Sequence, residues 1–299
     1  MFARREPVSG RRVRRDLVWI LSLATTAFVL VVIVAPGLIA PSSPNAIDTS
    51  ALLAAPSWNH LFGTNELGQD LFSRVVYGTR TEAAIGFGSI GVALALGIPT
   101  GLAAGLTHRA VDEVLTSLGE GVLAFPIVLL GVLIVASLGA SAMTLVAVLS
   151  LVFWPQVHLV VRGQAKALAE REFVLAAEVM NLGRRKVIAR HVLPHMLNSV
   201  AVLVPQLVAV AILTEAGLSY LGLGLQPPAV SWGTIMYSSE AYYQQAPWYA
   251  LITGAVITFS AAGLMLIGDR VARRIGERRM RILPWRLRSA RVSQEAGLS

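Results

Sequence analysis

Long apolar stretches alternate with short polar segments along most of the chain. The apolar runs occupy about residues 17–40, 82–106, 121–138, 142–161, 197–222 and 248–268. Each run is long enough to cross a bilayer as a helix, which takes roughly 20 apolar residues. The pattern therefore predicts an all-α, polytopic membrane protein with six transmembrane helices. The first run is longer than the apolar region of a signal peptide, so we expect it to be retained as a span.

The basic residues indicate the orientation of these spans. If the N-terminus is cytoplasmic, every Lys and Arg except Arg74 and Arg80 falls in a cytoplasmic segment. Such asymmetry is what the positive-inside rule produces. We therefore expect both termini to be cytoplasmic and divide the chain into a basic N-terminal segment at 1–16, a transmembrane domain at 17–275 with a long cytoplasmic loop at 163–194, and a C-terminal tail at 276–299.

Composition agrees with a membrane protein and excludes several other classes. Hydrophobic residues make up 55% of the chain, charged residues 14%, and the mean hydropathy is +0.65, too apolar for a soluble surface of this size. The net charge of +8 does not indicate nucleic acid, because the basic residues flank apolar spans instead of interleaving with aromatic residues. With no cysteine, disulfides and thiolate metal sites are excluded.

The residues that ATP binding or catalysis would need are missing from the sequence. Neither Lys166 nor Lys186 follows the glycines of a phosphate-binding loop, so this chain is not expected to bind ATP in that way, and no cofactor or metal is predicted. His158, Glu215 and Asp269 fall near the ends of predicted spans, where they make a poor proton relay. We interpret His158 as a hydrogen-bonding residue at a helix end. A stand-alone carrier and a membrane-embedded enzyme therefore remain weaker alternatives.

Prolines inside the predicted spans have two interpretations. Pro99, Pro126, Pro155 and Pro205 each remove one backbone hydrogen bond and bend a helix unless neighbours compensate. Bent helices often line a transport path. Proline is also simply commoner in membrane helices than in soluble ones.

The loop at 163–194 has the pattern of two short helices. Phe173, Ala176, Ala177 and Met180 are spaced as one helical stripe, and Asn181 to Gly183 favours a break. A basic helix is expected from about 184 to 191, followed by Pro194 in the first turn of the next span. We also expect Pro194 to interrupt the helix between His191 and His195. By spacing alone, the stripe fits a partner protein and the lipid headgroups equally well.

Several motifs resemble one family of ATP-driven importers. The loop resembles the E-A-A loop of ATP-binding-cassette importer permeases, and its end, R-H-V-L-P at 190–194, is similar to that of the dipeptide, oligopeptide and nickel permeases. F-G-T-N-E-L-G-Q-D at 62–70 and E-A-G-L-S-Y-L-G-L-G at 215–224 resemble two further motifs of this family, especially of the second permease in each system. The chain departs from the family pattern at Gln69, Leu175 and Asn181.

The resemblance implies a type I importer permease fold and a non-catalytic subunit in the bacterial cytoplasmic membrane. The implied partners are a second, homologous permease, cytoplasmic ATPase subunits, an extracellular substrate-binding protein, a peptide substrate and membrane lipid, but no nucleic acid. Nickel chelates and haem-like ligands remain alternative cargoes. The residues implied to couple to the ATPase are Glu172, Phe173, Ala176, Ala177, Met180, Asn181, Gly183, Arg190, His191 and Pro194.

The outer segments are the expected contact region for the binding protein. They include Asp70, Arg74, Trp232 and Gln226, which we predict as contact or gate residues. Tryptophan also anchors membrane proteins at the bilayer interface, so Trp232 has that second interpretation.

Overall fold

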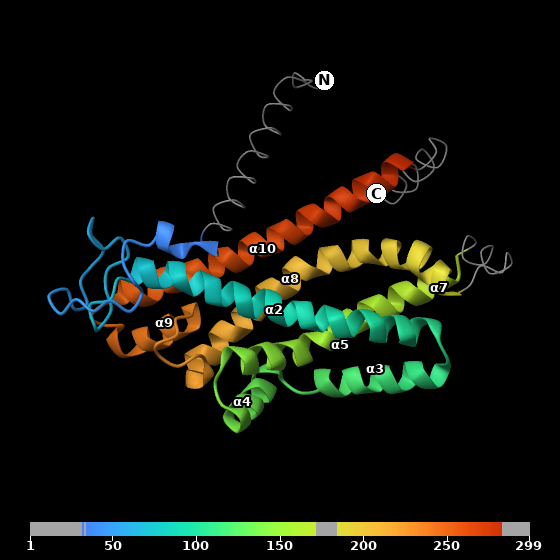
Figure 1. Ribbon diagram of the computed structural model, residues 1–299, viewed down its shortest axis with the longest axis horizontal. Coiled ribbons are helices and arrows are strands. Elements are labelled where there is room, and N and C mark those ends of the chain that lie inside the picture. Colours follow the sequence, from blue (N-terminus) through green and yellow to red (C-terminus); the bar gives the residue numbers. More distant parts are fainter. Residues whose placement is uncertain (1–31, 33, 172–183, 283–299) are drawn as a thin grey trace, which may run out of the picture. The chain divides into compact units, whose positions relative to one another are not determined.

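The structure is a computed structural model that describes residues 32, 34–171 and 184–282. Within these residues the regular elements are helices and one isolated antiparallel bridge between Thr64 and Asp70, and a long loop without helix runs from Ile39 to Asp70. The longer helices are α2 (Leu71–Leu106), α3 (Arg109–Leu123), α4 (Ile127–Leu138), α5 (Ala142–Ala169), α8 (Leu193–Leu218) and α10 (Pro247–Ile282) (Figure 1). The shorter ones are η1 (Pro36–Leu38), α7 (Arg184–Val187), the π-helices η2 (Ile188–Val192) and η3 (Ser219–Leu223), α9 (Trp232–Ser239) and η4 (Glu240–Tyr242).

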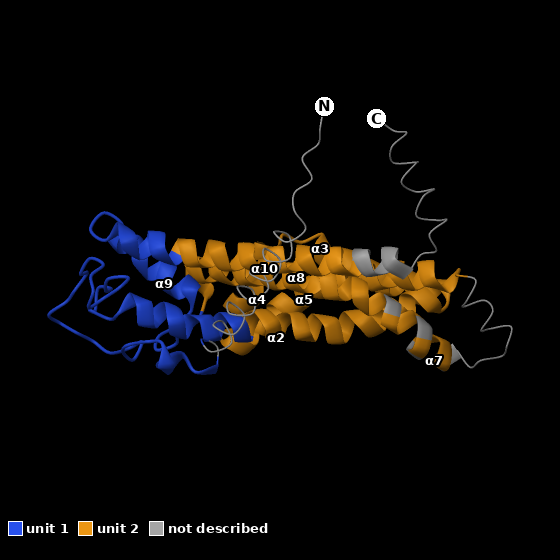
Figure 2. Cartoon of the chain, turned by 90° about the horizontal axis from the view of Figure 1, so that it is seen from above, with its two compact units in different colours: residues 1–84, 225–253 blue, residues 85–224, 254–299 orange. Residues whose placement is uncertain are grey.

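Two compact units make up the chain (Figure 2). Unit 1 comprises Met1–Ala84 and Leu225–Thr253, and unit 2 comprises Ile85–Gly224 and Gly254–Ser299. Unit 1 therefore holds the loop before α2, the first turns of α2, α9 and the start of α10. Unit 2 holds the rest of α2 and α10 together with α3, α4, α5 and α8.

Four of the described helices are long and apolar enough to cross a membrane. They are Leu71–Leu106, Ala142–Ala169, Met196–Leu223 and Pro247–Ile275. α3 and α4 would make a fifth span as a pair, but they meet at an angle of 87°. The predicted run at 17–40 falls mainly outside the described residues, so the expected count of six spans stays a prediction.

The helix expected at 121–138 is broken at Pro126, one of the prolines expected to bend a span. Pro126 precedes α4 with an extended ψ of 126°, and the helix before it ends at Leu123. Proline disfavours the helical conformation of the residue before it, here Phe125, so α3 cannot continue into α4. Hydropathy does not register this change of direction, because both arms of the bend are apolar enough to be read as one run.

α5 is the core of unit 2. Buried residues make up 61% of its apolar window, against 17–39% in the other three candidate spans of the described chain, and α5 packs against α3, α4 and α8. The remaining helices expose large apolar side chains, as in a protein covered by lipid or by other apolar surfaces. Examples are Leu129, Leu133, Leu251, Phe259 and Leu266, each at least 60% exposed.

α3 has its polar face turned inward. Asp112, Thr116 and Gly119 lie toward α5, whereas Val114 and Leu118 are 60% and 58% exposed. In water this arrangement would be unfavourable, because the apolar side chains would stay hydrated. It suits a helix whose outer face meets hydrocarbon or another apolar surface.

Candidate functional site

The predicted coupling loop is only partly described. Glu172, Phe173, Ala176, Ala177, Met180, Asn181 and Gly183 lie outside the described residues. The predicted stripe and the break at Asn181 therefore stay predictions. What can be described is the end of α5 and α7, which lie on the two sides of the undescribed residues 172–183.

After the undescribed residues 172–183, the helices α7, η2, α8 and η3 follow one another directly from Arg184 to Leu223, with a kink at Gly222, whose φ is +79°. This segment presents Lys186 and Arg190 to the outside, while Val192 and Met196 are buried at 1% and 0% exposure. The described end of the loop thus has an apolar face against the body of unit 2 and a basic face outward. The side chain of His191 lies outside the described set.

Pro194 occupies the first turn of α8, as expected, and is exposed. The expected interruption of the helix is wrong, because η2 passes directly into α8. A proline ring collides with the carbonyl four residues earlier, and the wider π-turn that precedes Pro194 gives it room. The helix adapts at this point instead of ending.

In unit 1, Asp70 lies at the start of α2. Its Oδ2 accepts hydrogen bonds from the backbone N–H of Ser73 at 2.8 Å and from the Ser73 hydroxyl at 2.7 Å, and its Oδ1 lies 3.1 Å from His60 Nδ1. This is the geometry of an N-cap, in which a side-chain oxygen satisfies an N–H that the helix leaves unpaired. Asp70 therefore fixes where α2 begins, at Leu71 instead of the expected residue 82.

Arg74 points into the loop that precedes α2. It donates to the carbonyl oxygen of Pro44 at 3.0 Å and to Gln69 Oε1, while Asn65 Nδ2 also donates to Gln69 Oε1, at 2.9 Å. Arg74 is only 9% exposed. A buried guanidinium of this kind needs acceptors from the surrounding chain. Arg74 therefore orders the loop, and Gln69, one of the positions where the chain departs from the family pattern, supplies one of the acceptors.

Neighbouring residues of the same loop show how closely it is built. Gly68 has a φ of +72°, and a Cβ there would stand 1.8 Å from the carbonyl oxygen of Asp48. The conformation of the loop thus requires glycine at position 68.

In the same loop, hydrogen bonds from the hydroxyl of Ser50 at 2.5 Å and its N–H at 2.9 Å lower the pKa of the Asp48 carboxyl.

Trp232 joins α9 to α2 inside unit 1. Its backbone N–H donates to Glu82 Oε1 at 2.8 Å and its Nε1 donates to the carbonyl oxygen of Val75 at 3.0 Å, while its ring packs where a Cβ on Gly78 would stand, at 3.0 Å. Trp232 is 4% exposed. The reading of Trp232 as an interfacial anchor is therefore wrong within this unit.

Asp70, Arg74 and Trp232, predicted as contact or gate residues, are all buried within unit 1, and both roles stay predictions. Their side chains bond within unit 1 and shape its surface instead of forming it. Gln226 is exposed, so its role as a contact residue stays a prediction. It lies beside Pro228, whose carbonyl oxygen accepts a 3.1 Å hydrogen bond from Asn45.

His158 does not lie at a helix end, contrary to expectation. It sits inside α5, is fully buried, and places Nδ1 3.2 Å from Thr100 Oγ1 of α2 and Nε2 3.5 Å from Thr116 Oγ1 of α3. α5 extends past residue 161 to Ala169, so the predicted span was too short. Polar residues at the end of α5 are paired with α3, and hydropathy alone does not show this.

A ridge of glycines on α2 was missed. A Cβ built on Gly97, Gly101 or Gly105 would stand 2.6–2.7 Å from side-chain atoms of Val157, Val161 or Ala165 on α5. Real Cβ contacts do not reach such distances. The signal was a glycine at every fourth position, the spacing that lets two membrane helices approach closely.

The described residues contain no group of three His, Asp or Glu side chains placed to hold a metal ion. The only histidine–carboxylate pair among them that lies within 4.0 Å is His60 with Asp70, described above.

Comparison with known sequences places these features in a family. The profile of the family described as "Binding-protein-dependent transport system inner membrane component" matches residues 97–281. The chain is similar to the dipeptide transport system permease protein DppC of Alkalihalophilus pseudofirmus, with 36% identity over 244 residues, covering 82% of this chain and 80% of that protein. A putative peptide permease of Brucella suis is 35% identical over 231 residues, 77% of this chain and 76% of the relative.

A third relative extends the similarity, and a solved structure shares the fold. A putative peptide transport system permease of Brucella abortus is 34% identical over 262 residues, 88% of each chain. The inward-facing MetNI methionine ABC transporter contains a chain that superposes with a TM-score of 0.58 at 15% identity, covering 69% of this chain and 97% of that one. This likeness supports the type I importer permease fold.

Proposed function

Because this chain belongs to the family of binding-protein-dependent transport system inner membrane components, we propose that it is the membrane-spanning subunit of an ATP-driven importer of peptides. The observation that carries the cargo class is the 36% identity, over 82% of this chain, to a relative named as a dipeptide permease. Further relatives at 34–35% identity are also named as peptide permeases.

In this proposal the subunit provides the transport path and the helices whose displacement changes that path. The sequence has no phosphate-binding loop, so ATP hydrolysis is assigned to partner subunits on the cytoplasmic side. The transport systems of this family depend on a binding protein, to which we assign the first capture of cargo. A second, related permease would complete the path.

The loop at 163–194 is the proposed contact with the ATPase. Support comes from its basic outward face at Lys186 and Arg190 and from its position between α5 and α8, the two helices that pack together in the core of unit 2. A push on a loop held between two packed helices is passed to both of them, because packed cores transmit displacement well. Cargo movement would follow from the displacement of these helices.

The loop assignment is tested by a charge placed on the predicted contact stripe. We expect Ala177→Arg to abolish binding of the ATPase subunits and peptide uptake while the chain still inserts into the membrane, because a bulky cation does not fit a docking groove. Ala110→Arg, at an exposed position in the first turn of α3 and outside the loop, is the matched control and should transport normally. Normal uptake by the Ala177→Arg variant would rule out docking at this stripe.

The cargo class is tested separately, in proteoliposomes that hold the complete complex with its binding protein. Peptides of graded length, a nickel chelate and haem are supplied in parallel. We expect ATP-dependent uptake of peptides alone. Uptake of only the nickel chelate or haem would overturn the peptide assignment and leave the importer assignment intact.

A further inference from the structure

We propose that Asp112 fastens α3 to the end of α5, so that the two helices move as one rigid body when the loop after α5 is displaced. The inference rests on the proposed function and adds to it a positioning residue that lies outside the predicted coupling loop.

One side of α5 carries a polar side chain at every fourth residue. Trp154, His158, Arg162 and Lys166 follow one another at this spacing, which places them along a single stripe of the helix. We call these four residues the polar ladder. It runs toward the end of α5 that leads into the loop.

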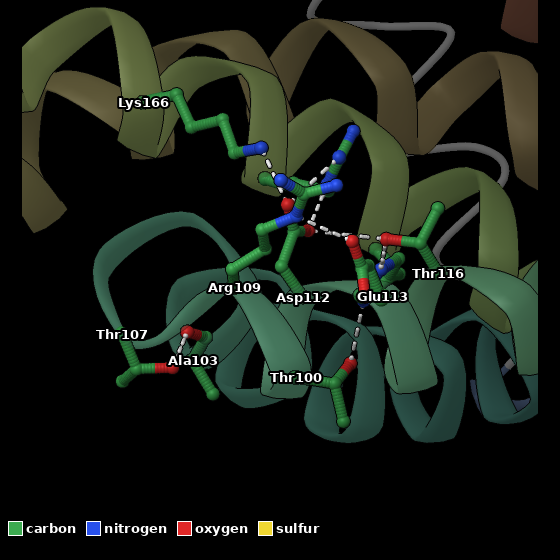
Figure 3. A network of polar contacts seen from close by, with 10 residues as sticks. Thr100, Ala103, Thr107, Arg109, Asp112, Glu113, Thr116 and Lys166 are labelled. Atoms are coloured by element: carbon green, nitrogen blue, oxygen red, sulfur yellow. Dashed lines mark hydrogen bonds and ion pairs between the residues drawn. The ribbon is translucent and has the colours of Figure 1, made fainter.

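Asp112 binds Arg162 and Lys166, the two residues of the polar ladder that lie nearest the loop (Figure 3). Arg162 donates two hydrogen bonds to the Asp112 carboxylate, one from Nε to Oδ1 and one from Nη2 to Oδ2 at 3.0 Å. Lys166 Nζ also donates to Oδ2, at 2.5 Å. Thr116 adds a hydroxyl to Oδ1 at 3.3 Å. The Asp112 side chain is only 13% exposed. A forked guanidinium–carboxylate pair sheltered from water is both directional and strong.

The positions of these charges along their helices favour the same contact. Asp112 lies in the first turn of α3 and Lys166 in the last turn of α5. A carboxylate is favoured at a helix N-terminus and a cation at a C-terminus. The neighbouring pair of Arg109 with Glu113 is different, since its side chains are 90% and 60% exposed and it connects residues of one helix.

The other two residues of the polar ladder, Trp154 and His158, contact α2, and His158 also contacts α3. Trp154 Nε1 donates to Thr100 Oγ1 at 3.0 Å, and His158 lies between Thr100 of α2 and Thr116 of α3. The glycine ridge of α2 packs on the next stripe of α5, at Val157, Val161 and Ala165. α5 is therefore held on two adjacent sides, and sliding against either neighbour would break close contacts.

If α3 and α5 form one rigid body, its movement is passed on at the C-terminal end of α3. α5 ends at Ala169, directly before the loop, and α3 ends at Leu123, before the 87° bend that leads to α4. If α3 and α5 move together, a displacement of the loop appears at residues 124–126. The proposal then requires that α4, which also packs on α5, shifts at this bend while the contact between α3 and α5 is kept.

The first test compares two adjacent residues in the complete, reconstituted importer. Asp112→Asn removes the charge that holds α5, and Glu113→Gln makes the same chemical change on the exposed side of α3. We expect Asp112→Asn to lower peptide transported per ATP hydrolysed about tenfold, within the roughly 5- to 150-fold range of coupling between protein sites. Glu113→Gln should leave this ratio unchanged. An unchanged ratio for Asp112→Asn overturns the proposal.

A charge exchange separates this role from a general need for Asp112 in folding. We expect Asp112→Arg to lose coupling and the double variant Asp112→Arg with Arg162→Asp to recover at least half of it, because the ion pair is restored with its direction reversed. The failure of a properly assembled double variant to recover counts against the fastening role. If the unaltered complex takes up no peptide, the proposed function itself has failed.

Distance measurements test the rigid body directly. Since the chain has no cysteine, spin labels can be placed on Glu113→Cys and Ala167→Cys, with partner subunits that also lack cysteine. We expect the distance between these labels to stay the same with and without ATP. The distance between Glu113→Cys and Leu129→Cys, across the bend, should change. A distance between 113 and 167 that shifts with the nucleotide overturns the proposal.

Discussion

Gly101 illustrates how much can depend on one missing side chain. A Cβ at this position would stand 2.6 Å from Val161 Cγ1 and 2.7 Å from the carbonyl oxygen of His158. The second contact is with backbone, which cannot rotate away. α2 and α5 must therefore separate before any larger residue fits.

We expect Gly101→Val to destabilise the protein by about 1–3 kcal/mol, the usual cost of overpacking a closely packed site. Gly91→Val is the matched control, because Gly91 lies in the same helix with no atom within 4 Å of its Cβ position. Thermal unfolding of the purified chain in detergent measures both. Equal midpoints for the two variants would contradict the close approach of α2 and α5.

Burial of single polar residues was the least predictable property of this chain. Arg74 and Asp70 precede the apolar part of α2 and were predicted as contact or gate residues, yet their partners include residues of the loop before the helix, as far away as Pro44. The contact between Trp232 and Glu82 joins residues 150 positions apart. Periodicity reports which side of a helix is apolar, but it contains nothing about such distant pairings.

At the scale of elements, the capping of α2 gives a test of a helix boundary. We expect Asp70→Ala to lose about 1 kcal/mol of stability at the start of α2, because the Ser73 N–H loses its acceptor. Amide hydrogen exchange over residues 71–75 should quicken several-fold, with little change further along the helix. Asp70→Asn keeps an acceptor oxygen and should exchange almost as slowly as the unaltered chain. Equal exchange in both variants would contradict the cap.

Element boundaries failed where polar residues are paired inside a helix. α5 was expected to end near 161, but it continues through Arg162 and Lys166, which both pair with Asp112 of α3. In contrast, the positions of α8 and of Pro194 in its first turn were predicted well, since a proline signal is local. A signal that depends on one residue and its chain neighbours can be recognised in a sequence, whereas pairing between helices cannot.

At the scale of the whole molecule, hydropathy was sufficient to predict a helical membrane protein. The motifs at 62–70, 190–194 and 215–224 were sufficient to indicate the family, which the match over residues 97–281 confirms. Pro126 indicated a bend, but its angle of 87° was not predicted, because a count of apolar residues does not distinguish a bent helix from a broken one.

Orientation in the membrane stays a prediction and can be tested by labelling from outside intact cells. Trp58 is 96% exposed in the segment predicted to be external, so we expect Trp58→Cys to react with a membrane-impermeant maleimide. Ser293→Cys, in the predicted cytoplasmic tail, should react only after the cells are opened. The reverse pattern would invert the topology.

The glycine ridge also bears on how the gene tolerates error. A change in either of the first two bases of a glycine codon gives a stop or an amino acid with a Cβ, and even alanine would place that atom within 2.7 Å of α5 at each of the three ridge positions. Missense mutations in these codons should therefore be lost in random mutagenesis under selection for transport. Those at the codon for Gly91, where there is open space, should accumulate.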